Sequence, residues 1–350
     1  MSDIHDQFLS QLHEPLHFER VEGCAFFISA YVAPFHFVIP RWVFVQSSDV
    51  PEQCLSLPPS LDCRRGLTGT KEARGFTQPH IAYRLHLKVI LRGQEIEPRT
   101  THEAWQEIKL LPYTDDYPPT DIRDFPGEFV QSISSSFKMS IFKSMFHTMR
   151  MSMEEPAAVH LGKVPRTTSA AILVEVEPPL GDVQAAPIEH LITRLPKLTF
   201  DIKVELRIKT FHSTTPFPRI PSRSPLPSQG PLRLDNQFLK LDIIKTKPAS
   251  WNNLLHFSPQ QKDSNAGRSS PANTSLLPIS PRKWNATLQA PVTLPSTLLP
   301  TFCSVVVARQ YSLIMRVKAV GISTRVFRLE VPLQVIYPAP ESAGFTSNAI

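Results

Sequence analysis

Thiols are the most reactive side chains in this chain, and their spacing favours no particular reaction. The cysteines are Cys24, Cys54, Cys63 and Cys303, and no two of them form a Cys-x-x-Cys pair. A redox motif or a zinc site is usually marked by such close spacing. We therefore expect reduced, buried thiols, and we disfavour a disulfide or a zinc site. A thiol nucleophile would need a base brought near by the fold.

Carboxylates are densest in an acidic stretch that holds Asp115, Asp116, Asp121 and Asp124. Four oxygen donors in ten residues could bind a cation, but their spacing is not that of an EF-hand loop. A charged linker has the same composition. The chain also lacks the GxSxG elbow, the GxxxxGK[ST] phosphate loop and the GxGxxG fingerprint. We therefore expect a protein that is not an enzyme and has no cofactor and no metal.

Positive charge is concentrated in one region. The net charge is +6, and residues 210–283 alone hold ten Lys or Arg against three Asp or Glu. A basic excess is weak evidence for a nucleic-acid-binding face. A solvated, proline-rich loop explains it more simply, so we do not expect a nucleic-acid partner.

The same basic region contains Ser-Pro pairs that proline-directed kinases could modify. Each phosphate would add about −1.5 to −2 charges and offset the basic excess. Such pairs also arise by chance in Pro/Ser-rich loops. The candidate phosphorylation sites are Ser224, Ser258, Ser270 and Ser280.

Residues 129–153 have an ambiguous apolar period. Five of the seven methionines lie here, and apolar residues recur every four positions from Phe129 to Met153. This spacing predicts an amphipathic helix. Lys138, Lys143 and Arg150 would let that helix lie on an anionic membrane surface. Alternation around Met151 fits a strand as well, and a segment packed against its own domain is the simpler interpretation.

Most of the remaining pattern is typical of β-strands. Residues 81–91, 197–209 and 311–335 alternate apolar and polar side chains, and the last range breaks at Gly321 to form a hairpin. Residues 81–91 predict a strand with one buried face. Charged side chains of the second range are expected to face solvent: Asp201, Lys203, Glu205, Arg207 and Lys209.

The chain holds 35 prolines and 12 glycines, a ratio that disfavours long helices. We therefore predict an all-β fold of two tandem immunoglobulin-like β-sandwiches, the first of them incomplete, with long Pro-rich loops. The predicted order along the chain is a partial first domain over 1–127, a linker or amphipathic segment over 128–154, a second domain over 155–338 with a disordered insertion near 258–283, and a tail over 339–350.

Several short motifs, in this order, resemble arrestin-like proteins. Residues 33–40 (APFHFVIP), 57–60 (LPPS) and 81–85 (IAYRL) resemble the second half of an arrestin-like N domain. Residues 124–129 (DFPGEF) look like the interdomain segment of fungal α-arrestins. Residues 195–211 and 299–313 look like the arrestin C domain. The resemblance covers most of residues 30–337 and implies that the first sandwich is shortened at its N-terminus.

The resemblance implies an adaptor in the trafficking of membrane proteins. Such proteins bind cytosolic parts of transporters or receptors and bring a HECT-type ubiquitin ligase to them, and endocytosis follows. The ligase contact is usually a PPxY motif read by a WW domain, and this chain has none. No apolar run is long enough to span a membrane. We therefore expect a cytoplasmic protein, peripheral at the plasma membrane or endosome. The alternative is a peripheral membrane-binding or scaffold protein that recruits no ligase.

Overall fold

The predicted all-β class is confirmed by the computed structural model. It describes residues 19–21, 30–32, 39–43, 49–63, 79–91, 99–114, 117–138, 146–162, 164, 166–178, 193–223, 230–254 and 283–339. Within these residues, helical structure amounts to short turns only, including η1 (Glu52–Cys54), η4 (Ile122–Asp124) and η5 (Leu195–Lys197). No helix in this part of the chain is long and apolar enough to cross a membrane.

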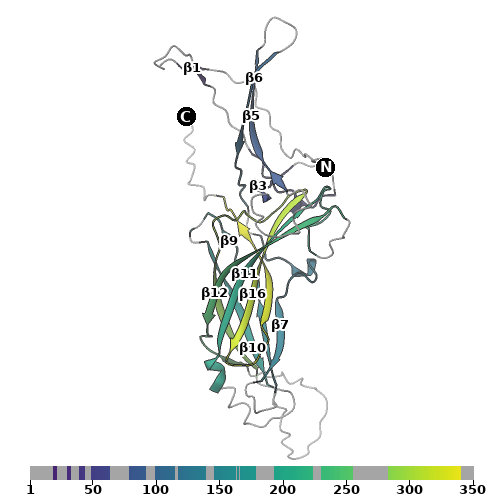
Figure 1. Cartoon of the computed structure of the whole chain (residues 1–350). Coiled ribbons are helices and arrows are strands. Elements are labelled where there is room, and N and C mark those ends of the chain that lie inside the picture. The colour runs from purple at the N-terminus through teal and green to yellow at the C-terminus, as the bar shows by residue number, and fades with distance from the viewer. Residues whose placement is uncertain are drawn as a thin grey trace, which may run out of the picture.

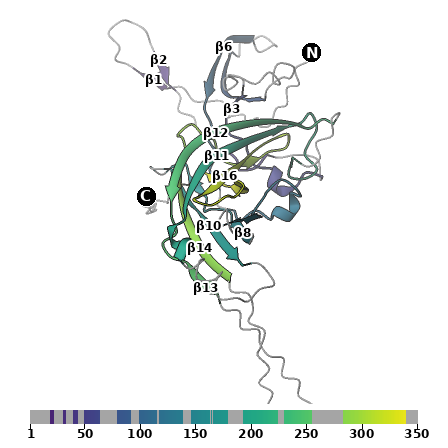
Figure 2. The same cartoon turned by 60° about the horizontal axis from the view of Figure 1, so that its bottom comes forward.

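Two antiparallel sheets form one β-sandwich (Figures 1 and 2). The first sheet has the order β12 (Arg233–Thr246), β11 (Thr199–His212), β16 (Val307–Val320) and β15 (Phe302–Cys303), and β17 (Phe327–Leu333) also pairs with β16. The second sheet has the order β13 (Asn252–Leu254), β14 (Lys283–Thr293), β10 (Thr167–Glu177), β8 (His147–Met153) and β7 (Ser132–Phe137).

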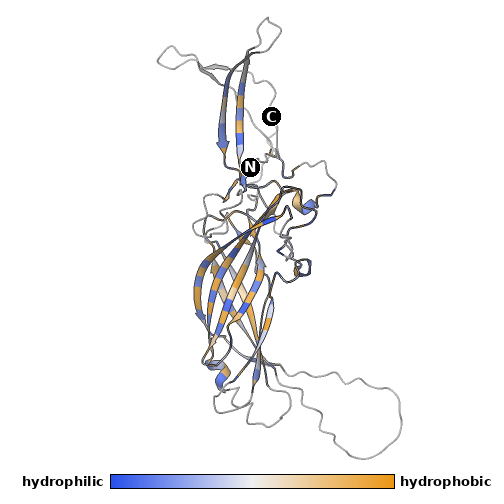
Figure 3. Cartoon of the chain, turned by 45° about the vertical axis from the view of Figure 1, so that its right-hand side comes forward, coloured by the Kyte–Doolittle hydropathy of each residue, from blue (hydrophilic) through white to orange (hydrophobic). Residues whose placement is uncertain are grey.

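The main core lies between these sheets. Alternate residues of each strand point inward, which gives the banded hydropathy of Figure 3. Phe200 and Leu206 of β11 and Leu313 of β16 are fully buried there, and Ile172 and Leu288 are buried opposite them. The predicted hairpin is confirmed, because β16 and β17 pair around a turn in which Gly321 has φ of +92°. That left-handed conformation favours glycine.

The described residues within 129–153, which are 129–138 and 146–153, form strands and not the predicted amphipathic helix. They supply β7 and β8, which pair with each other. The period-2 alternation is therefore the correct interpretation, and it places Met149, Met151 and Met153 in the core, each no more than 2% exposed. The sandwich consequently begins in the segment that was predicted to be a linker, ahead of residue 155.

The described residues before 128 do not form a second sandwich. They form three separate two-stranded sheets, β1 (Glu19–Val21) with β2 (Ala30–Val32), β3 (Leu61–Asp62) with β4 (His80–Ile81), and β5 (Tyr83–Leu91) with β6 (Arg99–Ile108). Val43, residues 50–63 and Ile81 instead pack on one end of the sandwich. There Cys54, Leu57 and Leu61 share a second hydrophobic cluster with Phe211 and Phe302.

Hairpin β5–β6 extends away from the sandwich (Figure 1). The alternation that predicted this strand is real, but its apolar face is buried only at its start. Ile81 is 6% exposed and Tyr83 packs against the second hydrophobic cluster. Further along, Leu87 is 52% exposed, and Trp105 on β6 is 64% exposed. A lone two-stranded hairpin is marginally stable.

The last described strand returns to the second sheet's side of the sandwich. Strand β18 (Val335–Ile336) pairs in parallel with β9 (Val159–His160). The side chain of Gln334 donates to Glu155 over 3.0 Å beside that pair. Most of the predicted insertion over 258–283 and nearly all of the tail over 339–350 lie outside the described residues.

Candidate partner-binding surface

Of the three basic residues proposed to contact a membrane, the structure describes Lys138 and Arg150, and each has its own partners. Lys138 lies just after β7, in an isolated bridge with Ser323, and its ammonium is 4.4 Å from the centre of the Phe146 ring. Arg150 is on the outer face of β8, where its Nε donates to Ser132 Oγ over 2.8 Å. Lys143 lies outside the described residues.

Of the apolar residues that would form the membrane face of the predicted helix, Phe137, Met149 and Met153 are buried in the core. We therefore expect a variant with Lys138→Glu and Arg150→Glu to bind anionic vesicles no less than the wild type, and both proteins to bind little. Flotation with vesicles of mixed phosphatidylcholine and phosphatidylserine measures this. Clear flotation of the wild type that the double variant loses would contradict the expectation and restore the membrane-surface interpretation.

The four candidate phosphorylation sites all lie outside the described residues. Ser224 lies within the undescribed residues 224–229. Ser258, Ser270 and Ser280 lie within 255–282, also outside the described residues. Their modification stays a prediction from sequence.

A buried ion pair joins the segment that precedes β7 to the outer face of the first sheet. Lys209 Nζ donates to Glu128 Oε1, and both side chains are 0% exposed. The other carboxylate oxygen, Oε2, accepts the backbone N–H of Arg223 over 2.9 Å. The Lys209 ammonium also lies 4.8 Å from the centre of the Phe129 ring, in a cation–π contact. The carboxylate and the ring that contact this ammonium both come from the DFPGEF segment.

A second buried carboxylate lies on the same face. Glu330 of β17 accepts Arg207 Nη1 over 2.7 Å and Ser312 Oγ over 2.9 Å, both at Oε1, and Arg328 Nη2 over 2.9 Å at Oε2. Its backbone also exchanges two hydrogen bonds with Val130. A charge buried this deeply needs such full pairing. The carboxylate of Glu128 and the backbone of Glu330 together fasten residues 128–130 to the sheet.

Two side chains thus differ from their predicted environment. Arg207 and Lys209 were expected to face solvent, yet they are 4% and 0% exposed. They do point away from the sandwich core, as alternation requires. The DFPGEF segment covers Lys209, whereas Arg207 pairs with Glu330 and lies 5.1 Å from the centre of the Phe238 ring. Gly127, with φ of +73°, makes the turn that directs Glu128 onto the sheet. Alternation along one strand contains no information about what covers its outer face.

Burial lowers the pKa of Lys209 from its ordinary 10.5, and attraction to Glu128 offsets part of this shift. In the unfolded chain the amine keeps the ordinary pKa. Between the lowered value and 10.5 the unfolded state therefore binds more protons, and stability rises with pH. We expect this slope, up to about 1.4 kcal/mol per pH unit, to disappear in Lys209→Met. Urea unfolding at several alkaline pH values measures it; equal slopes in both proteins would contradict the cause given.

Strand β12 is the long exposed edge of the first sheet. It pairs with β11, and no other described strand pairs with its free side. Phe238 is 55% exposed and Ile243 is 67% exposed. Phe238 pairs with Arg207 of β11, and Ile243 pairs with Lys203. Both apolar side chains therefore lie on the outer face of the sheet. An edge with unpaired backbone groups and exposed apolar side chains is a template for an added strand.

Charge and shape limit which strand could add to β12. Lys240 and Lys245 are exposed beside the two apolar residues, and edge lysines oppose indiscriminate pairing. A bulge also interrupts the register between Lys203 and Glu205 of β11, which leaves an extra residue in β12. A complementary strand would carry apolar residues that meet Phe238 and Ile243 and acidic residues that meet the lysines. We refer to Phe238, Lys240, Ile243 and Lys245 as the β12 surface.

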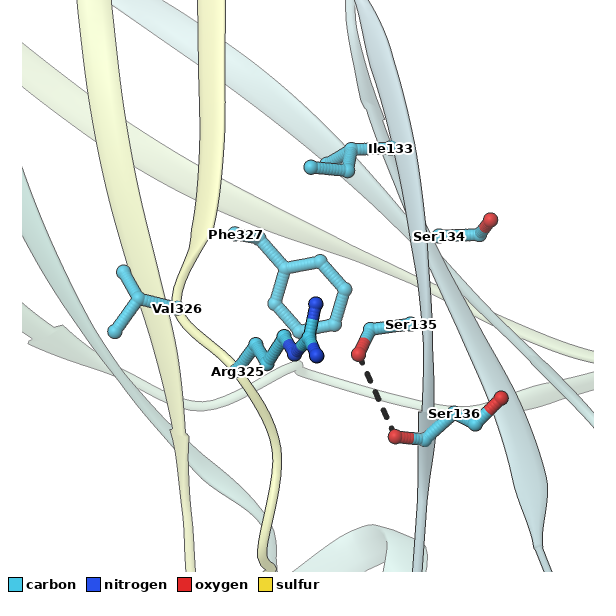
Figure 4. Close-up of a pocket in the computed structure, with 7 residues that line it drawn as sticks. All are labelled: Ile133, Ser134, Ser135, Ser136, Arg325, Val326 and Phe327. Atoms are coloured by element: carbon cyan, nitrogen blue, oxygen red, sulfur yellow. Dashed lines mark hydrogen bonds between the residues drawn. The ribbon is translucent and has the colours of Figure 1, made fainter.

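A small pocket lies where the two sheets meet at their other edge (Figure 4). Its volume is 420 Å³, and it is lined by Ile133, Ser134, Ser135, Ser136, Arg325, Val326 and Phe327. In Figure 4 the Phe327 ring and Arg325 lie between the two strands, facing Ser135. Ser135 Oγ donates to the backbone oxygen of Ser136 over 3.4 Å. This hydroxyl has no base beside it in the pocket lining, so the geometry does not activate it as a nucleophile.

Cys63 does not have the environment of a catalytic cysteine. Burial raises the pKa of Cys63 to about 11, which leaves little thiolate at neutral pH. Cys54 has another thiol as its partner, from Cys303. Within the described ranges, no group of three His, Cys, Asp or Glu side chains is placed to hold a metal ion. Cys24 lies outside these ranges.

One metal-ligand spacing near the start of the chain was not among the predicted sites. His13, Glu14 and His17 occur in the order HExxH, which binds zinc when both histidines lie on one face of a helix. Pro15 between them lacks the backbone donor that a helix interior uses. The segment lies outside the described residues, and no part of the proposed function rests on it.

Comparison with known proteins assigns no relationship. No family model and no curated protein matches this chain. The resemblance to arrestin-like proteins therefore rests on the short motifs and on their order along the chain.

Proposed function

We propose that this protein is a non-catalytic, arrestin-like adaptor that binds cytosolic segments of membrane transporters or receptors during their trafficking and endocytosis. The observation that carries the proposal is the β12 surface, a 14-residue edge strand with a free side and with two apolar side chains more than half exposed. It suits an extended peptide with alternating apolar and acidic residues.

Two further observations support the proposal. The fold is an all-β sandwich, the class that the family resemblance implies. The DFPGEF segment, which carries part of that resemblance, is fixed to the sheet through Glu128. A rigid sandwich with one free edge is suited to present a constant docking strand. Fold alone does not determine function, so the proposal depends on the edge.

Ubiquitin-ligase recruitment is the less supported part of the proposal. A HECT-type ligase usually reads PPxY through a WW domain, and the chain lacks that motif. Recruitment would then require another adaptor or a different contact. The scaffold alternative, without a ligase, makes the same use of the β12 surface.

Proximity labelling in cells tests the proposal. A biotin ligase fused to the full chain is expected to label integral membrane proteins of the plasma membrane or endosome. The labelling should exceed that by a cytosolic control fusion. Co-labelling of a HECT-type ubiquitin ligase would favour the adaptor over the scaffold. Labelling of neither class above the control would overturn the proposed function.

A further inference from the structure

Two cysteine sulfur atoms from distant parts of the chain are in contact where the N-terminal residues pack on the sandwich. Sγ of Cys54 lies 2.6 Å from Sγ of Cys303, and 249 positions separate the two residues in sequence. The S–S bond of a disulfide is about 2.04 Å long. The two sulfurs are therefore roughly half an ångström from bonding distance.

Backbone hydrogen bonds hold both cysteines in place. Cys54 ends η1, where its N–H donates to Pro51 O over 2.8 Å, and the next residue, Leu55, accepts Val43 N–H over 2.7 Å. Cys303 is in β15, opposite Ala308 of β16. Cys54 is 0% exposed, and Cys303 packs against the same hydrophobic cluster. The approach of the sulfurs thus follows from two independently anchored backbone segments.

We propose that Cys54 and Cys303 are an oxidative modification site, at which a small peroxide converts the two thiols into a disulfide that locks residues 49–63 onto the β15 edge of the sandwich. The site is distinct from the β12 surface and does not rest on the proposed function.

The chemistry assigns different roles to the two sulfurs. A hydrogen bond from Cys303 lowers the pKa of Cys54, against the opposing effect of burial, whereas burial raises the pKa of Cys303. Cys54 is therefore the first to ionise, and the thiolate is the nucleophile. Cys303 is only partly buried, so the pair is open to a small oxidant on that side.

The reaction balances with hydrogen peroxide as the oxidant. The Cys54 thiolate attacks one peroxide oxygen, an S–O bond forms, the O–O bond breaks and hydroxide leaves, giving a sulfenic acid. The Cys303 sulfur then attacks Cys54 Sγ, an S–S bond forms and the S–O bond breaks. The released hydroxide ions take up the thiol protons. In total, two thiols and one peroxide give one disulfide and two waters, and two electrons pass from sulfur to oxygen.

The crosslink would fix the base of hairpin β5–β6. Tyr83 at the start of β5 donates from its hydroxyl to Pro58 O over 2.6 Å, and β3 pairs with β4 immediately before it. Pro58 and β3, the partners in these two contacts, both lie within the locked residues 49–63. Closing so long a loop restricts the unfolded chain, so oxidation should raise the Tm by roughly 5 to 10 °C.

Peptide mapping of the full chain tests the proposal. The reduced protein is treated with hydrogen peroxide, alkylated and digested with trypsin, which should release Cys54 in residues 42–64 and Cys303 in residues 284–309. The expected product is a reducible crosslink between these two peptides. Because Cys63 shares the first peptide, the same experiment on Cys63→Ser is expected to give the crosslink undiminished.

The variant Cys54→Ala is expected to lose both the crosslink and the rise in Tm. Absence of the 42–64 to 284–309 crosslink from wild type and Cys63→Ser would overturn the proposal, as would a crosslink that requires Cys63 or joins Cys24 instead. The maps of wild type and Cys63→Ser decide the question even if Cys54→Ala does not fold.

Discussion

Replacing Glu128 by methionine should destabilise the protein by about 3 to 5 kcal/mol, because it leaves the buried Lys209 ammonium without its counter-charge. Lys209 is 0% exposed, so water cannot replace the lost partner. The Phe129 ring, 4.8 Å away, and the Glu330 carboxylate still attract the ammonium. A cation–π contact is too weak to compensate, and Glu330 already has two arginine partners. Urea unfolding followed by tryptophan fluorescence gives the free energy of unfolding.

The double variant Glu128→Met/Lys209→Met separates the cost of an unpaired buried charge from the cost of changed side-chain packing. Removing both charges from a buried site is often neutral or stabilising, so this variant should recover most of the stability that Glu128→Met loses. Glu205→Met is the matched control, since Glu205 pairs with the half-exposed Arg316 over 3.2 Å. An exposed pair of this kind contributes about 1 kcal/mol or less. Equal losses for Glu128→Met and Glu205→Met would contradict the fastening role of the buried pair.

Charge introduced on the β12 surface should abolish partner recovery without unfolding the protein. Ile243→Glu places a carboxylate on a residue that is 67% exposed, so stability should change by only about 0.5 kcal/mol. Against a docked acidic and apolar strand, the same change removes an anchor and adds repulsion. A central anchor contributes at least about 2 kcal/mol to binding, so recovery should fall roughly 30-fold.

The control for this effect is a carboxylate at an exposed apolar residue elsewhere. Val164 is 89% exposed and lies outside the β12 surface, so Val164→Glu should leave the labelled membrane proteins unchanged. The measurement is quantitative proximity labelling with the Ile243→Glu, Val164→Glu and wild-type fusions, normalised to expression. Equal losses of labelled membrane proteins in both variants would mean that any added surface carboxylate weakens binding, and would contradict a specific role of the β12 surface.

The fold could be predicted from sequence wherever alternation was long and unambiguous. Residues 199–212 and 311–333 alternate over many positions, and both ranges form the expected strands. The helix predicted for residues 129–153 is wrong in the described part of that range because the apolar spacing there fits two periods. Apolar residues that recur every four positions also fall on one face of a strand, whose period is two. The core contact of Met151, 0% exposed, depends on partner strands that the local pattern does not specify.

The candidate sites depended on contacts that no local pattern contains. Glu128 and Lys209 are 81 residues apart, and a strand's charged face looks the same whether solvent or another segment covers it. Cys54 and Cys303 are separated by 249 residues, so spacing could not join them. The exposed edge of β12 follows from strand order, which is a property of the whole sheet. The proposed class of function comes from the family resemblance, and the proposed surface comes from the topology.

Site-specific photo-crosslinking in cells tests the adaptor proposal most directly. A photoreactive amino acid is placed at position 243 on the β12 surface, and in a second protein at position 164. The account predicts adducts with integral membrane proteins from position 243 and none from position 164. Identical adducts from both positions, or adducts from position 243 that contain no membrane protein, would contradict it.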